Sequence, residues 1–184
     1  MSRTRREPRG KKINPHFWVF CEGETEEAYV KFLRSNYRLH IEIIPKIVGN
    51  KITEKFIKNY KKDKPIHEKD VDFLIYDADV PELLEKLKKI KNTVLIASNP
   101  SIELWFLLHY KNQKAEISAT ECIKELCNRN RNTYKKGLID NKLASKLNEN
   151  KYEALKRAKN SSLFQNPSSN MNELIDILDK IKRN

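Results

Sequence analysis

Residues 19–29 read Val-Phe-Cys-Glu-Gly-Glu-Thr-Glu-Glu-Ala-Tyr, and the rest of the chain is organised around this stretch. An apolar run, residues 17–21, breaks near Gly23 and passes into an acidic turn followed by an amphipathic pattern. This order predicts a buried strand that feeds a helix. Acidic side chains and an N-cap at Thr25 suit the start of a helix. Glu22 differs, because it precedes the glycine, at the strand end where open α/β sheets bind ligands.

Two later apolar runs also end in polar residues. Residues 71–76 run into Asp77-Ala78-Asp79, and residues 93–97 run into Ser98-Asn99-Pro100-Ser101. Alternate residues of an extended chain point the same way, so Asp77 and Asp79 would project together if both lie in the strand. Strands that alternate with helices predict an α/β fold with a mostly parallel sheet flanked by helices. The predicted strands are 17–21, 39–48, 71–76 and 93–97, and the predicted helices between and after them are 25–37, 52–62, 81–90 and 102–110.

The length of 184 residues suits one compact domain. We expect residues 1–13 to form a basic flexible arm, residues 14–110 the α/β core, and residues 111–184 a helical layer packed on the same domain. Amphipathic spacing predicts four helices in that layer, at 116–127, 138–147, 152–160 and 171–181, with breakers between them such as residues 166–169. These helices are expected to lie away from the ligand-binding edge. The last of them either closes the core or offers a docking surface for a partner.

The chain is strongly basic. Its 37 Lys and Arg residues against 25 Asp and Glu residues give a formal net charge of +12 and a pI near 9.5. A field of this sign favours polyanionic partners, and we expect nucleic acid. Arg5 and Arg6 in the arm are predicted to contact phosphates, although a basic tail can also serve solubility alone.

The cysteines and the hydropathy pattern exclude several classes of protein. Cys21, Cys122 and Cys127 form no CxxC pair and have no histidine at ligand spacing, so we expect neither a zinc site nor a disulfide framework. No apolar run approaches the length needed to cross a bilayer, and the first residues lack the apolar core of a signal peptide. We therefore expect a cytoplasmic protein without a membrane partner.

Acidic residues follow the first strand and the buried third strand, and in a doubly wound sheet such strand ends meet at one edge. These residues are Glu22, Glu26, Asp77 and Asp79. Carboxylates clustered without basic partners repel one another unless a cation neutralises them, and an all-oxygen site favours Mg²⁺ or Mn²⁺. Such a metal serves phosphodiester chemistry. The alternative is that the four residues are separate helix caps and turn residues.

A longer set of motifs resembles the RloB-like family and, through a Glu and DxD pattern, the Toprim domain of topoisomerases, primases and overcoming-lysogenization-defect nucleases. The motifs are CEGETEEAY at 21–29, IYDAD at 75–79, SNPSIELWFLLHY at 98–110, YKK at 134–136 and NPSSNMNELIDIL at 166–178. The resemblance implies a Toprim-like (Rossmannoid) fold and a nuclease that depends on Mg²⁺ or Mn²⁺. It also implies antiviral defence of the abortive-infection or restriction-linked type, with an ABC- or AAA-type ATPase encoded nearby as partner.

The resemblance further implies roles for individual residues. Glu22 would be the Toprim glutamate, Asp77 and Asp79 the DxD pair, and Glu26 a further metal ligand. Either Lys135 or Lys136 would supply a positive charge for the phosphate. The remaining predicted catalytic residues are Glu103 and Lys135, and the remaining predicted substrate-binding residues are Ser98, Asn99 and Lys136.

The sequence also leaves several points open. Ala78 departs from relatives that often have a basic residue between the two aspartates, and His109 is more simply a structural histidine than a catalyst. The chain contains no P-loop, so NTP-dependent control would come from a partner. A second function class is a non-catalytic subunit that binds nucleic acid or a partner protein, and a third is a phosphatase or nucleotidyl transferase. The residues do not distinguish DNA from RNA, including tRNA, as the substrate.

Overall fold

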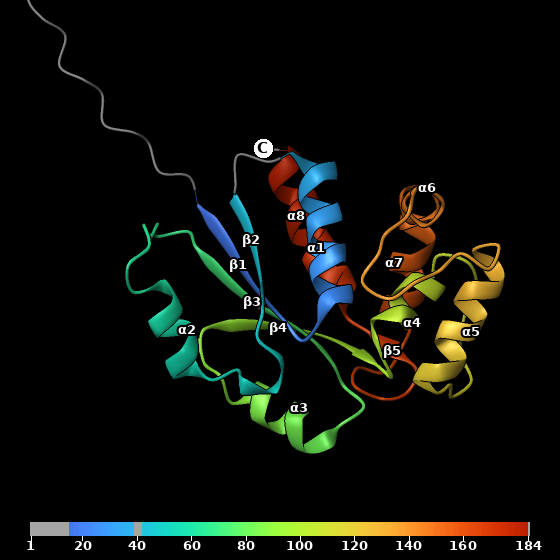
Figure 1. Cartoon of the computed structure of the whole chain (residues 1–184), viewed down its shortest axis with the longest axis horizontal. Helices are drawn as coiled ribbons and strands as arrows, with labels where there is room; N and C mark the ends of the chain where they lie inside the picture. The colour runs from blue at the N-terminus through green and yellow to red at the C-terminus, as the bar shows by residue number, and fades with distance from the viewer. Residues whose placement is uncertain (1–14, 39–41, 184) are drawn as a thin grey trace, which may run out of the picture.

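The computed structural model describes residues 15–38 and 42–183 (Figure 1). The predicted basic arm, with Arg5 and Arg6, lies outside the described residues. Within the two described stretches, no helix combines the length and the apolar character that crossing a membrane requires.

A five-stranded sheet runs through the middle of the protein (Figure 1), in the order β2-β1-β3-β4-β5. The first four strands pair in parallel, whereas β5 runs antiparallel to β4. The strands are β1 (His16–Cys21), β2 (Glu42–Ile47), β3 (Val71–Asp77), β4 (Thr93–Asn99) and β5 (Ser168–Ser169). The prediction of an α/β fold with a mostly parallel sheet is confirmed.

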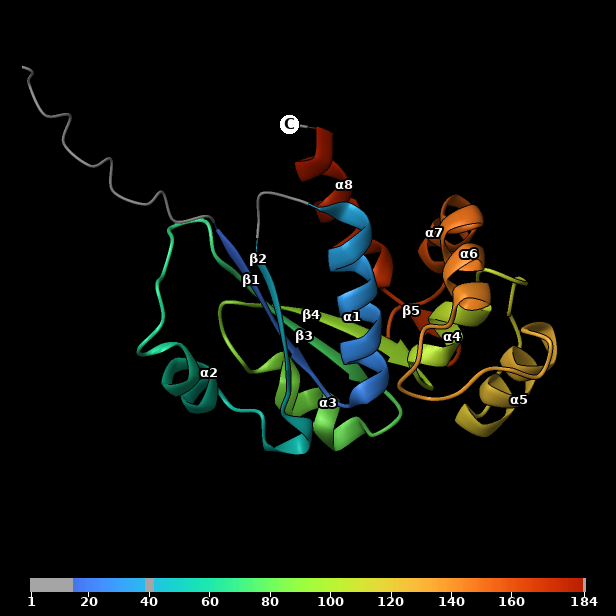
Figure 2. The same cartoon turned by 45° about the horizontal axis from the view of Figure 1, so that its top comes forward.

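Helices cover both faces of the sheet. The helices α1 and α8 lie side by side over one face, and α2 and α3 lie on the other (Figures 1 and 2). The helices are α1 (Glu24–Tyr37), α2 (Glu54–Lys61), α3 (Pro81–Lys88), α4 (Ile102–Leu107), α5 (Ala119–Arg129), α6 (Asn141–Glu149), α7 (Lys151–Lys159) and α8 (Met171–Arg183), with a 3₁₀ turn η1 at Gly49–Lys51. Each predicted helix is present, although α4 ends at Leu107, before the predicted end at Tyr110.

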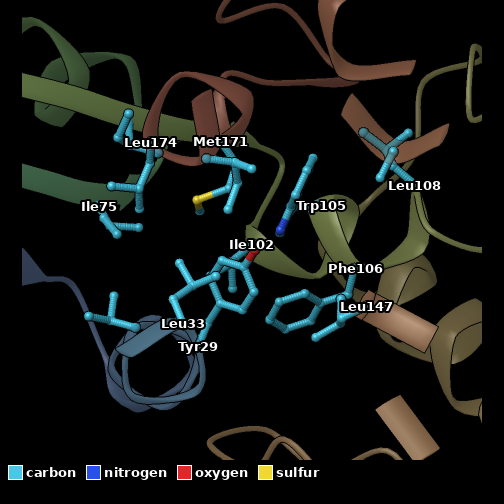
Figure 3. Close-up of a cluster of buried hydrophobic side chains, with 14 of the residues drawn as sticks. Tyr29, Leu33, Ile75, Ile102, Trp105, Phe106, Leu108, Leu147, Met171 and Leu174 are labelled. Atoms are coloured by element: carbon cyan, nitrogen blue, oxygen red, sulfur yellow. The ribbon is translucent and has the colours of Figure 1, made fainter. Parts of the chain in front are cut away.

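The central strands are buried on both faces, which explains their almost unbroken apolar sequence. In β1, Phe20 is 0% exposed and packs on the side of α2, whereas Val19 is 1% exposed and packs on the side of α1. The apolar side chains of the described residues form two main core clusters and a small third one at Ala78, and the larger main cluster joins the sheet to α1, α4 and α8. Figure 3 shows Tyr29, Trp105 and Met171, one from each of these helices, within that cluster.

The helix α8 uses its apolar face inside the protein. Met171, Leu174 and Leu178 are each at most 2% exposed and belong to the larger core cluster. The hydroxyl of Tyr37, at the end of α1, donates a hydrogen bond to Asp179 Oδ1 at 2.8 Å. This apolar face is therefore not free for a partner. Of the two alternatives left by the sequence, the structure supports closure of the core.

The segment expected to be only a chain breaker contains the fifth strand. Two polar residues show no periodicity, so sequence analysis did not predict β5. Directly after it, Asn170 continues the pairing with its side chain. Its Oδ1 accepts from the Ala97 amide at 2.6 Å, and its Nδ2 donates to the Leu95 carbonyl at 2.9 Å. These bonds attach the start of α8 to β4.

Replacing Asn170 with alanine is expected to lower the free energy of unfolding by about 2 kcal/mol, because two backbone groups of β4 lose their partners. Urea denaturation followed by circular dichroism measures the change. Asn172→Ala is the matched control, since Asn172 is half-buried and has no side-chain hydrogen bond within the described residues. Equal losses in the two variants would contradict the role assigned to Asn170.

Candidate functional site

A pocket of about 310 Å³ opens at the carboxyl ends of the two central strands. From β1 the chain crosses to β2 on one side, and from β2 it returns to β3 on the other side of β1. This reversal leaves a crevice between β1 and β3, the position where open α/β sheets bind ligands. The pocket is lined by Glu22, Gly23, Glu24, Thr25, Glu26, Asp77, Glu103, Lys136 and Gly137.

Backbone N–H groups hold the carboxylates of Glu22 and Asp77. The amide of Asp77 donates a hydrogen bond to Glu22 Oε2 at 2.9 Å, which ties the end of β3 to the residue after β1. The amide of Ile102 donates to Asp77 Oδ1 at 2.9 Å. The second oxygen of each carboxylate has no hydrogen-bond partner in the described part of the chain. Two strand ends thus offer one free carboxylate oxygen each.

The first turn of α1 brings Glu26 to the pocket. Gly23 is the N-cap of this helix, which corrects the assignment of Thr25 made from the sequence. The amide of Gly23 donates to Glu26 Oε2 at 2.9 Å. Only 5% of Glu26 is exposed, so α1 places a buried carboxylate in the pocket wall.

Glu103 is the most buried carboxylate of the pocket, at 1% exposure. The Tyr134 hydroxyl donates to its Oε1 at 2.8 Å, and the Ser101 hydroxyl donates to its Oε2 at 2.7 Å. Both oxygens are therefore engaged within the protein, and Glu103 orders the wall of the pocket. Sequence analysis missed the part played by Tyr134, although this aromatic residue beside two lysines was the available signal.

The loop between α5 and α6 reaches the pocket from the helical part of the chain. The amide of Gly137 donates to Thr25 Oγ1 at 3.1 Å. Gly137 has a φ of +73°, and a Cβ there would lie 3.3 Å from the Glu24 side chain, so both constraints favour glycine. This contact places Lys136 in the pocket wall, with its Nζ 3.8 Å from Glu103 Oε1. The helical part of the chain therefore contributes a loop to the pocket, whereas none of its helices from α5 onward lines it.

Lys135 and Asp79, both predicted site residues, do not line the pocket. Lys136 lines the pocket and its neighbour Lys135 does not, so Lys136 supplies the positive charge of the pocket wall. The strand β3 ends at Asp77, and Asp79 follows in an exposed bend, so the two aspartates do not project together from one strand. Burial of Glu22 is the largest cause of its raised pKa, and the charge of Asp79 also raises it.

Ser98 and Asn99 face the C-terminal segment instead of the pocket. The hydroxyls of Ser98 and Ser169 lie 2.8 Å apart, and Asn99 Nδ2 donates to the Phe164 carbonyl at 2.8 Å. Neither side chain lines the pocket. The geometry does not support their assignment to substrate binding, since both attach residues 164–169 to the end of β4.

Burial and mutual repulsion raise the pKa values of the clustered carboxyl groups. Burial is the largest cause of the raised pKa of Glu22 and of Glu26. The pKa of Asp77 rises from 3.8 to about 9, first through burial and then through the charges of Glu26, Glu22 and Glu103. The ionised cluster therefore carries a free-energy penalty that a cation would relieve.

The donors in the pocket suit a hard divalent cation. Glu22, Glu26 and Asp77 present carboxylate oxygens, the ligands that Mg²⁺ and Mn²⁺ prefer. Across residues 15–38 and 42–183, no three His, Cys, Asp or Glu side chains are grouped as a ready set of metal ligands. Mg²⁺ usually keeps several waters and takes only one or two carboxylates from the protein, so the pocket fits the ion without a complete cage.

Replacing Asp77 with asparagine is expected to stabilise the metal-free protein at neutral pH. The folded-state pKa is raised from 3.8 to about 9, so the stability contributed by protonated Asp77 is present at low pH and is lost as the pH rises through that range. Asparagine does not titrate. The melting temperature of Asp77→Asn should exceed that of the wild type by roughly 3 °C or more near neutral pH, and by little near pH 4. A lower melting temperature of the variant at neutral pH would contradict this cause.

Comparison with solved structures found a similarity of low identity. The chain is similar to the C-terminal region of the Burkholderia pseudomallei OLD protein, with a TM-score of 0.38, 14% sequence identity, and coverage of 92% of this chain and 100% of that chain. Similarity at this level assigns neither an activity nor residue roles. No curated protein matches the sequence.

The family model described as RloB-like protein matches residues 17–178. The match begins within β1 and ends within α8, so it spans the sheet and the pocket. Its range includes all five carboxylates that line the pocket, and Lys136. Because the match covers most of the chain, the protein belongs to the RloB-like family.

Proposed function

We propose that this protein is a nuclease that depends on Mg²⁺ or Mn²⁺ bound in the pocket at the ends of β1 and β3. The observation that carries the proposal is the convergence of five carboxylates on one pocket in a chain with a net charge of +12. A basic surface attracts nucleic acid, whereas an acidic pocket alone repels the phosphate that must react. A bound divalent cation removes this conflict.

Glu22 and Asp77 would hold the ion through their free oxygens, with Glu26 as a further ligand. When bound, such an ion polarises a phosphoryl oxygen and lowers the pKa of a bound water. The protein itself supplies orientation. The amides of Asp77 and Ile102 fix one oxygen of each principal carboxylate, so the other oxygen is preorganised for binding.

Lys136 is the residue of the pocket suited to bind the phosphate. Its side chain is 60% exposed, so the ammonium can reach an oxygen at the mouth of the pocket. Glu103, fixed by Tyr134 and Ser101, provides a counter-charge 3.8 Å from that ammonium. A positive charge held beside a phosphoryl group stabilises the negative charge that develops during displacement.

The relation to the Toprim domain and the role in antiviral defence are proposals that rest on the sequence motifs. Glu22 and Asp77 at adjacent strand ends support a Toprim-like arrangement, whereas the exposed position of Asp79 departs from it. The ABC- or AAA-type ATPase partner is proposed from the resemblance alone. The competing function is a non-catalytic subunit, which would bind nucleic acid without cleaving it.

Calorimetric titration is expected to show that the wild type binds Mn²⁺. The affinity of Glu22→Gln and of Asp77→Asn for Mn²⁺ should be lower by roughly tenfold or more, since each variant loses a ligand charge. The same variants should lose Mn²⁺-dependent cleavage of a panel of DNA and RNA substrates. Glu27→Gln is the matched control, because Glu27 lies in the first turn of α1 beside Glu26, pairs with Lys31 and does not line the pocket.

Two outcomes would contradict parts of this proposal. Unchanged Mn²⁺ affinity in both variants would remove the metal from the pocket. Nucleic-acid binding by the wild type without cleavage, in the presence of Mn²⁺, would favour the non-catalytic subunit.

Replacing Lys136 with alanine is expected to reduce the cleavage rate by roughly a hundredfold, because the developing phosphoryl charge loses its counter-charge. The affinity for Mn²⁺ should change little, since Lys136 is not a ligand. Lys135→Ala, at the neighbouring exposed position, is the control and should retain the wild-type rate. Equal rate losses in the two single variants would show that the lysines act only through the general charge of the loop.

A further inference from the structure

A second pocket, of about 430 Å³, is lined by residues of α1, α6, α7 and α8, and by His109. It shares no lining residue with the carboxylate pocket. The helix α1 connects the two, because its first turn borders the carboxylates and its later turns line this second pocket. Tyr29, Leu33 and Leu147, which line it, also belong to the core cluster in Figure 3. Its volume is in the usual range for a small-molecule site.

His109 supplies an unpaired acceptor to this pocket. Its Nδ1 lies 2.9 Å from the Trp105 carbonyl oxygen, which can only accept, so Nδ1 carries a proton. Burial lowers the pKa of His109 to about 4, so the ring is neutral at physiological pH and Nε2 keeps its lone pair. Nε2 has no hydrogen-bond partner among the described residues, although His109 is only 1% exposed. Nε2 is not among the fully enclosed unpaired side-chain atoms of the described residues, so water or a ligand in the pocket can donate an N–H or O–H group to it.

Aromatic and amide side chains share the pocket with this acceptor. The aromatic ones are Tyr29, Phe32, Tyr37 and Tyr152. Asn36 of α1 and Asn148 of α6 meet through a hydrogen bond of 2.9 Å from Nδ2 of Asn36 to Oδ1 of Asn148. Aromatic rings stack on nucleobases, and amide groups bind base edges. The lining therefore suits a flat heterocycle that carries hydrogen-bond donors.

Two lysines bring positive charge to the same pocket. Lys151 Nζ lies 3.0 Å from both carboxylate oxygens of Asp179, so its charge is compensated. Lys182 has no ion pair within the described residues, and its Nζ stands 5.5 Å from the ring centroid of Tyr37. An uncompensated ammonium beside aromatic rings is complementary to a phosphate attached to a base.

We propose that this second pocket binds a nucleoside phosphate, with the base against the tyrosines, an N–H group of the base on His109 Nε2, and the phosphate at Lys182. The ligand is either a free nucleotide or one unit of a nucleic acid chain, since the same groups recognise both. This site does not require the metal proposed for the carboxylate pocket.

Calorimetry in the presence of EDTA tests the proposal. EDTA removes divalent cations, so the measured binding excludes metal-dependent binding at the carboxylate pocket. The probes are the four ribonucleoside 5′-monophosphates, 5′-phosphorylated RNA and DNA trinucleotides, and two base-free ligands, inorganic phosphate and ribose 5-phosphate. We expect saturable binding of at least one nucleotide or trinucleotide at micromolar to millimolar concentrations, and weaker binding of both base-free ligands. Tighter binding of trinucleotides identifies a nucleic acid chain as the source, and tighter binding of monophosphates identifies a free nucleotide. Absence of binding by every probe, or equal binding of base-free ligands, would overturn the proposal.

Variants then locate the ligand. Lys182→Glu and His109→Asn are each expected to weaken binding about tenfold. Asparagine at 109 can still donate to the Trp105 carbonyl but has no acceptor at the Nε2 position. Lys180→Glu is the charge-matched control, because Lys180 is exposed on the same helix and does not line this pocket.

Equal weakening by Lys182→Glu and Lys180→Glu would show that binding follows net charge, and would overturn the site. His109 is buried, so its variant is interpreted only when its circular dichroism and melting temperature match those of the wild type. The exposed Lys182 provides a test that does not depend on the folding of the histidine variant.

Discussion

The hydrogen bond between the Asp77 amide and the Glu22 carboxylate lies where the two central strands end, and the candidate site is built outward from it. The parallel register of β1 and β3, with Cys21 opposite Ile75, brings the two residues together. A slip of one residue would turn the side chains of one strand to the opposite face. Both faces of these strands are buried in apolar clusters, so core packing fixes the position of the two acids.

The same burial makes ionisation of the carboxyl groups unfavourable, and Glu103 and Asp77 differ in how many hydrogen-bond donors compensate for it. Both oxygens of Glu103 accept hydrogen bonds from hydroxyl groups, so this residue is a fixed structural acceptor. Asp77 has a single backbone donor and a pKa raised to about 9. Because its ionisation is this costly, Asp77 lowers the stability of the folded protein at neutral pH. Residues that reduce stability in this way are characteristic of ligand-binding sites.

The sequence could predict the meeting of Glu22 and Asp77 because apolar runs and the alternation of strands and helices decide which strand ends share an edge. It could not choose between Lys135 and Lys136. That choice depends on the left-handed turn at Gly137 and on its contact with α1, more than a hundred residues away in the chain. The strand β5 was beyond sequence analysis for another reason, since two paired polar residues have no pattern to detect.

The order of these parts along the chain has a consequence for protein synthesis. The strands that present Glu22 and Asp77 are translated before the loop with Tyr134 and Lys136 and before the helix α8, which covers the sheet. A ribosome-bound chain that extends only through α4 has the acids but neither the lysine nor the cover. The pocket is therefore completed only after this loop and α8 have been synthesised, so the acidic strand ends form before the parts that enclose them.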